Sequence, residues 1–380
     1  MNKKQAILLL ASALLFCGDA LAQSWKMVIT KTDGTTEELL TRDISAITYT
    51  QDDTPELPDQ NADQIIIKEL YNGGCKRDDG TDFQYDKCII LYNNCPQQAV
   101  VNNLCFAVGT PYNGEANTKN YTADGDLVYE SEGFTPAQNG IWYYPHSLVI
   151  EPWSQVVISC MGSIDNTQAV SQSVNYANPD YYCMYDPESG YANTAYYPTP
   201  SAVIPASHYL QCVKYGQGNA WMLSVMSPAL FIYQPQGTTP AEHANNADNQ
   251  WCSPGESLTP VNACIKVPNE WIIDGIEVFN AAKREESKKR LTADIDAGYV
   301  YLTNKMGHTL YRNVDKEETE SLPENAGKLV YNYALGVDGS TDPSGIDAEA
   351  SIKLGAHIVY MDTNNSTVDF HERQKCSLRE

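Results

Sequence analysis

The sequence predicts a mainly β protein, built as a β-sandwich or a β-barrel. Short runs of β-branched, aliphatic and aromatic residues recur along the chain, and Gly, Pro and Asn lie between them. Many short strands separated by turn residues are typical of these two architectures. The runs are Ile65–Tyr71, Cys88–Tyr92, Ser147–Ile150, Val156–Ser159, Ala229–Tyr233, Trp271–Ile276, Tyr299–Leu302 and His357–Tyr360. One segment breaks the pattern. Ala, Glu, Lys and Arg dominate Asn280–Leu291, which predicts a helix with a solvated face.

Composition narrows the class of protein. The 380 residues contain 48 Asp and Glu against 25 Lys and Arg, for a formal charge of −23. This length suits one large β domain or two ordinary ones. The acid excess argues against nucleic acid and anionic membrane surfaces as partners, because phosphate-binding faces need clustered cations. Disorder is disfavoured by 10% aromatic and only 19% charged residues.

Residues 1–22 are predicted to be a secretory signal peptide. Lys3 and Lys4 precede an apolar run from Ala6 to Phe16, and Ala20–Ala22 forms a cleavage site. We therefore expect an exported protein, secreted or attached to the cell envelope, with no membrane-spanning segment. A lipoprotein anchored through Cys17 is the alternative, although lipidation sites favour a small residue where this chain has Phe16.

The next segments predict a small N-terminal element and a linker. Residues 23–50 contain two alternating runs around the turn Asp33–Gly34, which is a strong β-hairpin signal. Residues 51–62 combine Pro55 and Pro58 with acids and amides, as linkers do. A single large domain is then expected over residues 63–380.

Ten cysteines follow the predicted signal peptide, from Cys75 to Cys376. An even count in an exported chain favours disulfides, with free buried thiols as the alternative. Zinc is disfavoured, because structural sites need ligand pairs about two to four residues apart. The closest pair, Cys88 and Cys95, has six residues between its members. The spacing does not assign the pairing.

Catalytic signatures with recognisable spacing are missing from the sequence. We therefore predict no catalytic residue, no resident metal and no cofactor. A carboxylate-based hydrolase stays open as the alternative, because paired acids leave no local sequence pattern. Three acidic turns could hold calcium or be plain turns, the commoner use of Asp-Gly. They are Asp78–Asp82, Asp124–Asp126 and Asp338–Asp342.

A Tyr-rich stretch between Ser171 and Pro200 is the candidate binding region. Its rings have an apolar face and a polar tip, which suits a glycan or protein ligand. The alternative is that they pack the long loop onto the β domain. The seven residues are Tyr176, Tyr181, Tyr182, Tyr185, Tyr191, Tyr196 and Tyr197.

The C-terminal third of the chain contains the most specific sequence motifs. It contains Val267–Asp274, Asp296–Tyr299, Thr309–Arg312 and the segment Asp362–Phe370, which reads DTNNSTVDF. In this order, and with the opening run Ile65–Tyr71, the chain resembles domain-of-unknown-function family 4876. That family consists of uncharacterised Bacteroidota envelope proteins and is similar to lamin-tail domains.

The resemblance implies an immunoglobulin-like, lamin-tail-like β-sandwich with long loops over residues 63–380. Four residues would be structural: Arg312 on a late strand, and Asp362, Asn365 and Phe370 in the closing segment. The family brings no known activity or cofactor, and the cysteine richness departs from it. We expect a non-catalytic binding protein of the cell exterior, accessory to outer-membrane nutrient uptake or adhesion. Its expected partner is a protein or glycan ligand, including an outer-membrane receptor. The alternative is a hydrolase of an extracellular substrate.

Overall fold

The computed structural model describes residues 25–30, 35–45 and 57–379, and the chain divides into two units between Pro55 and Glu56. In the N-terminal unit, β1 (Lys26–Thr30) pairs antiparallel with β2 (Thr36–Leu40), and a 3₁₀ turn, η1 (Thr41–Asp43), follows. The predicted signal peptide, Cys17, the Asp33–Gly34 turn and residues 51–56 of the predicted linker lie outside the described residues.

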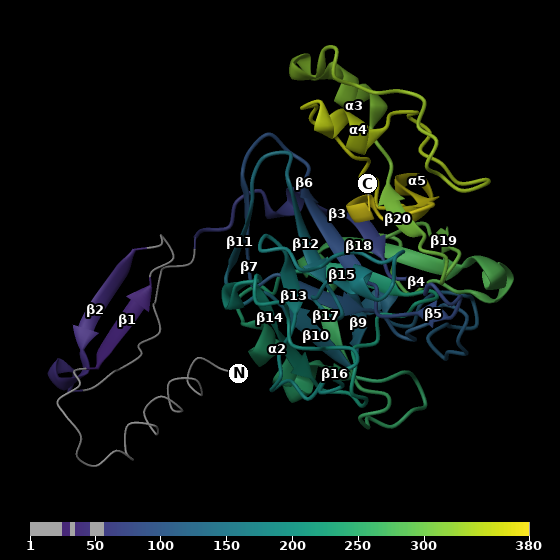
Figure 1. The fold of residues 1–380 in the computed structure, drawn as a ribbon. Helices are drawn as coiled ribbons and strands as arrows, with labels where there is room; N and C mark the ends of the chain where they lie inside the picture. The colour runs from purple at the N-terminus through teal and green to yellow at the C-terminus, as the bar shows by residue number, and fades with distance from the viewer. Residues whose placement is uncertain (1–24, 31–34, 46–56, 380) are drawn as a thin grey trace. The chain divides into compact units, whose positions relative to one another are not determined.

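One twelve-stranded sheet dominates the second unit (Figure 1). Its strands pair antiparallel except for β12 with β13, β13 with β14 and β18 with β19, which are parallel. In spatial order the strands are β19 (Val300–Leu302), β18 (Ile272–Asn280), β15 (Ala229–Tyr233), β8 (Cys105–Val108), β10 (Gly140–Tyr143), β14 (Tyr209–Lys214), β13 (Tyr182–Met184), β12 (Gln155–Ser159), β6 (Cys88–Asn93), β3 (Ile65–Tyr71), β20 (Thr309–Arg312) and β21 (Phe370–Arg373).

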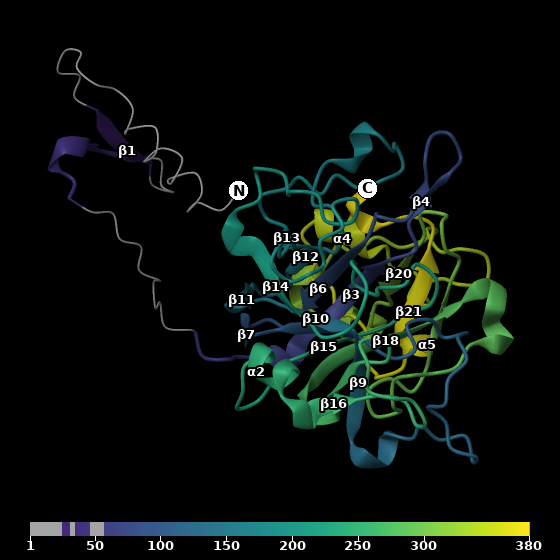
Figure 2. The same ribbon diagram turned by 90° about the horizontal axis from the view of Figure 1, so that it is seen from below.

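The two ends of this sheet approach one another, so that it nearly closes into a barrel (Figure 2). Thr303, directly after β19, donates its backbone N–H to Glu372 of β21 at 2.7 Å. We call the line where β18 and β19 face β3, β20 and β21 the seam. The mainly β class predicted from the sequence is confirmed, whereas an immunoglobulin-like sandwich is not. The physical reason is that successive strands remain in one hydrogen-bonded sheet that curls.

Smaller sheets and short helices cover this barrel. The smaller sheets are β7 (Ala99–Asn102) with β11 (Ser147–Ile150), β16 (Gln250–Trp251) with β17 (Cys264–Pro268) and β9 (Phe134–Gln138), and β4 (Cys75–Lys76) with β5 (Asp82–Phe83). The helices are α2 (Pro240–Asn245), α3 (Lys316–Ser321), α4 (Ala348–Lys353) and α5 (Ser366–Asp369). The remaining 3₁₀ turns are η2 (Ala62–Gln64), η3 (Glu130–Glu132), η4 (Asn166–Gln168), η5 (Ala206–His208), η6 (Ala247–Asn249), η7 (Asn269–Trp271), η8 (Ala281–Glu286), η9 (Pro323–Asn325) and η10 (Ser377–Arg379).

Seven of the eight predicted runs overlap strands, and the exception is His357–Tyr360, which makes only a single bridge from Tyr360 to Val314. The predicted helix over Asn280–Leu291 is wrong. Only the 3₁₀ segment η8 forms there, with non-helical backbone at Lys283. The expected solvated face is also wrong at Arg290, whose side chain is 2% exposed and paired with a carboxylate of β18. The tertiary contact of Arg290 with Glu277 thus overrides the helix propensity of this segment.

Side chains complete the backbone hydrogen bonding at the seam. β20 pairs with β3 at Leu70 and Glu69, so Ile67 lies beyond this pairing. Its N–H donates to Asp274 Oδ2 at 2.6 Å, and its carbonyl accepts from Arg312 Nε at 2.8 Å. Asp274 and Arg312 also form an ion pair. Burial raises the pKa of Asp274 to about 7, against the opposing effect of the Arg312 guanidinium.

Candidate functional site

A pocket of about 780 Å³ lies where α2 approaches β9, β17 and η7. Its volume falls within the range of small-molecule sites in proteins. The chemically informative residues around it are Glu132, Phe134, Glu242, His243, Asn246, Asn249, Lys266, Glu270 and Trp271. They come from three separate stretches of the chain, which only the folded sheet brings together.

Local sequence fixes the helix at this pocket. Thr239 accepts a hydrogen bond from the backbone N–H of Glu242, and Glu242 Oε2 accepts from the backbone N–H of Thr239 at 3.0 Å. This reciprocal capping box, with Pro240 at the first helical position, starts α2 after the loop. The helix therefore presents Glu242 at the rim and buries His243 beneath it.

His243 is 4% exposed and packs edge-on against Trp271, with ring centroids 4.8 Å apart. Burial lowers the pKa of His243, while a hydrogen bond with the Lys266 backbone opposes this shift. The imidazole is therefore neutral at pH 7. Its Nδ1 atom is buried without a hydrogen-bond partner in the described structure. Such an unsatisfied polar atom beside a cavity is a feature that a ligand or a water molecule can satisfy.

Aromatic rings form the other wall. Trp271 is half-buried in η7, and its carbonyl accepts from the backbone N–H of Gln234 at 2.9 Å. Phe134 packs beside Trp251, with centroids 5.9 Å apart, and Lys266 Nζ lies 5.3 Å from the Phe134 ring centroid. A fixed indole next to a neutral imidazole gives the pocket an apolar surface with polar edges.

The three carboxylates of the pocket are exposed at its rim. Hydrogen bonds from the Thr239 backbone and hydroxyl lower the pKa of Glu242, which is therefore ionised at pH 7. With Lys266 charged and His243 neutral, Glu132, Glu242 and Glu270 give the lining a net charge of −2. A general acid in hydrolysis needs a carboxyl whose pKa is raised by burial. The exposed carboxylates suit hydrogen bonding to a ligand better than acid catalysis.

The seven tyrosines predicted as a binding surface are distributed through the packing instead of forming one exposed platform. Tyr176, Tyr191 and Tyr197 are buried at 0%, 2% and 6% exposure, and the other four are half-buried. Tyr191 and Tyr197 pack on Trp142, while Tyr182 stacks on His208 with centroids 4.3 Å apart. Their role in binding stays a prediction, and their burial fits the packing alternative.

The residues expected to be structural meet at the seam. Arg312 Nη1 donates to Asp362 Oδ1 at 3.1 Å and to the Met361 carbonyl at 2.9 Å. The guanidinium lies over the Phe370 ring, 4.5 Å from its centroid. Asn365 caps α5 by accepting from the Thr367 N–H at 3.1 Å. The arginine therefore joins the closing segment to the β3 backbone.

Carboxylates of the acidic turns accept hydrogen bonds from backbone N–H groups. Asp79 accepts from the N–H and hydroxyl of Thr81, and Asp342 accepts from the N–H groups of Val314 and Ser344. Gly80, Gly125 and Gly339 have positive φ, as Asp-Gly turns require. Across the described residues, no group of three or more His, Cys, Asp or Glu has a metal-binding arrangement. Calcium at these turns stays a prediction.

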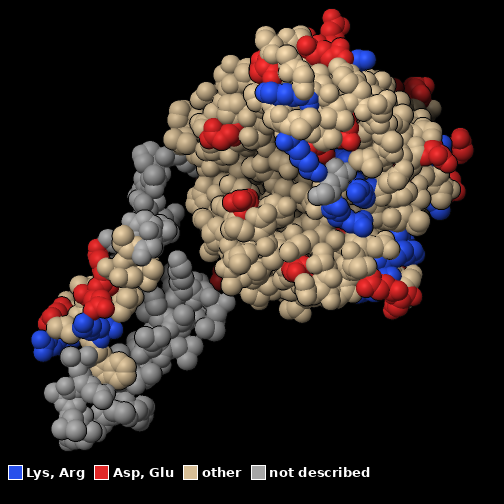
Figure 3. All heavy atoms as spheres, turned by 45° about the horizontal axis from the view of Figure 1, so that its top comes forward, with Lys and Arg blue, Asp and Glu red and all other residues tan. Residues whose placement is uncertain are grey.

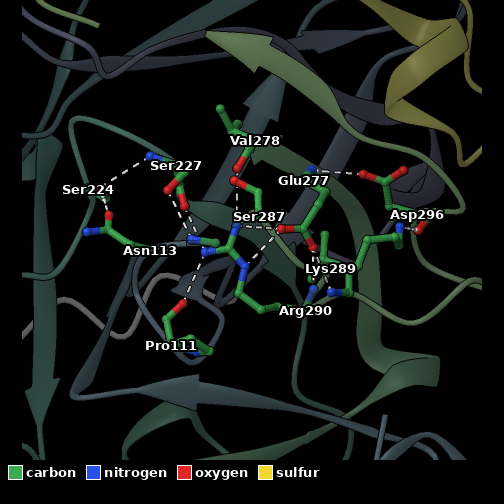
Figure 4. A network of polar contacts seen from close by, with 12 residues as sticks. Pro111, Asn113, Ser224, Ser227, Glu277, Val278, Ser287, Lys289, Arg290 and Asp296 are labelled. Carbon is green, nitrogen blue, oxygen red and sulfur yellow. Dashed lines mark hydrogen bonds and ion pairs between the residues drawn. The ribbon is translucent and has the colours of Figure 1, made fainter. Parts of the chain in front are cut away.

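Sequence reasoning missed the buried charges. Glu277 is fully buried and accepts from Arg290 Nε at 2.9 Å and from the Leu291 backbone N–H at 2.9 Å. Figure 4 shows Arg290 reaching in addition to the carbonyls of Pro111 and Ser227, at 3.0 and 2.7 Å. Because these partners are far apart in the sequence, no local sequence pattern predicts the contacts. In contrast, the visible charges of Figure 3 are spread in small groups of both signs.

The pocket itself was also missed. One signal was available, because Thr239-Pro240-Ala241-Glu242 is a capping-box sequence that marks a helix start. It predicts α2 but does not indicate that β9 and β17 lie opposite this helix.

Within the described part of the chain, no helix has the length and apolar character needed to cross a membrane.

The fold and the pocket together define a mainly β protein with an open, aromatic-lined site. Residues 151–332 match the model of a protein family of unknown function, DUF4876. The fold is similar to the crystal structure of a DUF4876 family protein from Bacteroides thetaiotaomicron VPI-5482, with a TM-score of 0.56 and 20% identity. The similarity covers 81% of this chain and 70% of that chain. No curated protein matches the sequence. The family resemblance noted in the sequence is therefore confirmed.

Proposed function

We propose that this protein is a non-catalytic binding protein of the cell exterior, whose pocket beside α2 holds a short neutral carbohydrate. The observation that carries the proposal is the Trp271 ring next to a buried, neutral His243, with carboxylates and amides around the rim. Sugars present apolar C–H faces and a ring of hydroxyls, which stack on indole and hydrogen-bond to such groups.

The charge of the lining argues for a neutral ligand. A net charge of −2 around the pocket repels phosphate, sulfate and uronic acid groups. Exposed Asn246 and half-buried Asn249 can both donate and accept hydrogen bonds, as sugar hydroxyls require. In this proposal the protein is accessory to nutrient uptake or adhesion at the outer membrane, where a receptor would be its protein partner.

A hydrolase that uses paired carboxylates is supported less well, because the glutamates of this pocket are exposed and Glu242 is held ionised by its own helix cap. Mass spectrometry of the ligand after prolonged incubation separates the two functions. Intact oligosaccharide supports binding alone, whereas cleavage products would overturn the non-catalytic assignment.

Isothermal titration calorimetry with neutral oligosaccharides and matched uronic acid oligosaccharides tests the proposal. We expect saturable binding of a neutral sugar and a loss of about tenfold in affinity for Trp271→Ala, or 1.4 kcal/mol. Tyr331→Ala is the control, because Tyr331 is an exposed aromatic residue that does not line this pocket. Equal losses in both variants, or no binding of any neutral sugar, would contradict the proposed function.

A further inference from the structure

Two cysteines that are distant in sequence meet beneath the C-terminal end of the chain. Cys88 begins β6 and Cys376 follows β21, and each is fully buried. They belong to one apolar cluster with Tyr71, Ile90 and Val157. Both are free thiols in the structure, and they are the two cysteines of this cluster. Neighbouring buried thiols whose Cα atoms lie within about 7 Å can form an S–S bond with a small adjustment of the side chains.

The strand register explains why they meet. Tyr71 and Ile90 lie opposite Cys88 and Glu69 respectively in the antiparallel pair of β3 and β6, so these four side chains share one face. On that face Glu69 Oε1 accepts from the Ser377 backbone N–H at 3.0 Å, and Glu69 Oε2 accepts from the Ser377 hydroxyl. Ser377 is thereby held against the sheet, and its neighbour Cys376 is placed over Cys88.

We infer that Cys88 and Cys376 form a disulfide in the oxidised protein, which fastens the C-terminal segment to β6. Each thiol loses its proton, and the two sulfurs together give up two electrons as the S–S bond forms. A small-molecule or protein disulfide accepts both electrons and both protons and leaves as two thiols. Oxidation must precede complete folding, because both thiols are inaccessible once the cluster has formed. This inference is independent of the carbohydrate pocket.

The surroundings of the other nearby cysteine favour this pairing. Cys75 is also buried, but its thiol interacts with the Asp86 carboxylate, which also accepts from the Tyr71 hydroxyl at 2.6 Å. A link between Cys88 and Cys376 closes a loop of roughly 290 residues, and long loops gain the most from closure. Burial and the neighbouring Cys88 raise the pKa of Cys376, so the Cys376 thiol stays protonated and unreactive in the folded, reduced protein.

Peptide mapping of the full chain tests the pairing directly. The chain is refolded with glutathione disulfide, denatured in an alkylating agent without reductant, and digested. We expect one cross-linked peptide pair containing Cys88 and Cys376, which separates on reduction with a gain of about 2 Da. Alkylation of both residues, or a link from either one to Cys75, would overturn the inference.

Thermal unfolding of variants gives a second readout. Wild-type protein that is reduced in denaturant and refolded with reductant should have a Tm roughly 5 °C or more below that of the oxidised protein. This difference between the oxidised and reduced protein should vanish in Cys376→Ser and in Cys88→Ser, and should persist in Cys183→Ser. Cys183 is a suitable control because it is equally buried but lies on β13. A wild-type Tm that does not respond to reduction would contradict the link, whatever the variants do.

Discussion

At the ion pair of β18, Glu277 and Arg290 are at most 2% exposed and satisfy one another and several backbone groups, whereas the glutamates of the pocket reach solvent. Glu277 accepts backbone N–H groups from both Arg290 and Leu291. Glu242 is held by Thr239, at the start of its own helix, and keeps its exposure. Both regions contain several charged residues. The buried ion pair is anchored on a strand of the large sheet, whereas the exposed glutamates of the pocket lie on loop segments and a short helix.

This difference teaches that burial, more than residue type, separates structural from ligand-binding charges in this protein. A buried ion pair costs desolvation, and it persists where hydrogen bonds satisfy each remaining atom. An exposed carboxylate keeps its water and can exchange it for a ligand hydroxyl. Substitutions in the two regions should therefore differ in kind: loss of stability at the buried ion pair and loss of affinity at the pocket.

The largest expected effect is at Glu277. Glu277→Gln should lower the free energy of unfolding by about 3–5 kcal/mol, because it leaves the Arg290 charge buried without a carboxylate. Urea unfolding followed by tryptophan fluorescence measures this change. Lys283→Ala, which breaks the exposed pair with Glu286, is the control and should cost less than about 1 kcal/mol. Similar losses of unfolding free energy in both variants would show that burial does not distinguish the two ion pairs.

Replacing both partners sharpens the same comparison. Glu277→Leu combined with Arg290→Met removes both charges, and we expect it to recover only part of the loss. The backbone N–H groups of Arg290 and Leu291 would still lack their carboxylate acceptor. Full recovery of the wild-type unfolding free energy would show that the charges matter and that these backbone bonds do not.

A smaller, pH-dependent effect is expected at Glu349. Burial disfavours its ionisation, but Lys68 at 2.6 Å and the Tyr311 hydroxyl outweigh burial and lower the pKa to about 2. Because the folded pKa lies below the ordinary value of 4.5, this stabilisation is present above pH 4.5 and is lost as the pH falls toward 2.

Urea midpoints between pH 7 and pH 2 check this sign. Wild-type stability should fall by about 2–3 kcal/mol more than that of Glu349→Gln over this range. The matched variant Glu317→Gln, at an exposed position on α3, should retain the wild-type slope. If Glu349→Gln shows the same pH dependence of stability as the wild-type protein, the ion pair of Lys68 with Glu349 does not cause the loss of stability at low pH.

The smallest effect on stability is expected at the pocket. Glu270→Gln should change the unfolding free energy by less than about 0.5 kcal/mol, because Glu270 is exposed. The same variant should bind the neutral sugar several-fold more weakly in calorimetry, because an amide is a poorer acceptor than a carboxylate. A stability loss comparable with that of Glu277→Gln would mean that the rim is part of the folded framework.

Local pattern predicted the strands well, because alternating or continuous apolar runs such as Ile65–Tyr71 and Ala229–Tyr233 favour β structure wherever they lie. Arg312 and the DTNNSTVDF segment were recognisable through their family resemblance. The pocket was not predictable, because Phe134, His243 and Trp271 meet only through the pairing of β9 with β17 and the placement of α2.

The sequence by itself determined the β class, the turns and the resemblance to a family of unknown function, since these depend on residues close together along the chain. The tertiary structure decided that the sheet curls into a near-barrel, that Arg290 and Lys68 are buried, and that His243 faces Trp271. The physical reason is that burial, ion pairing and register depend on which distant strands meet. Glutamate therefore has two roles in this protein: Glu277 is a structural anchor, and Glu270 is a candidate ligand contact.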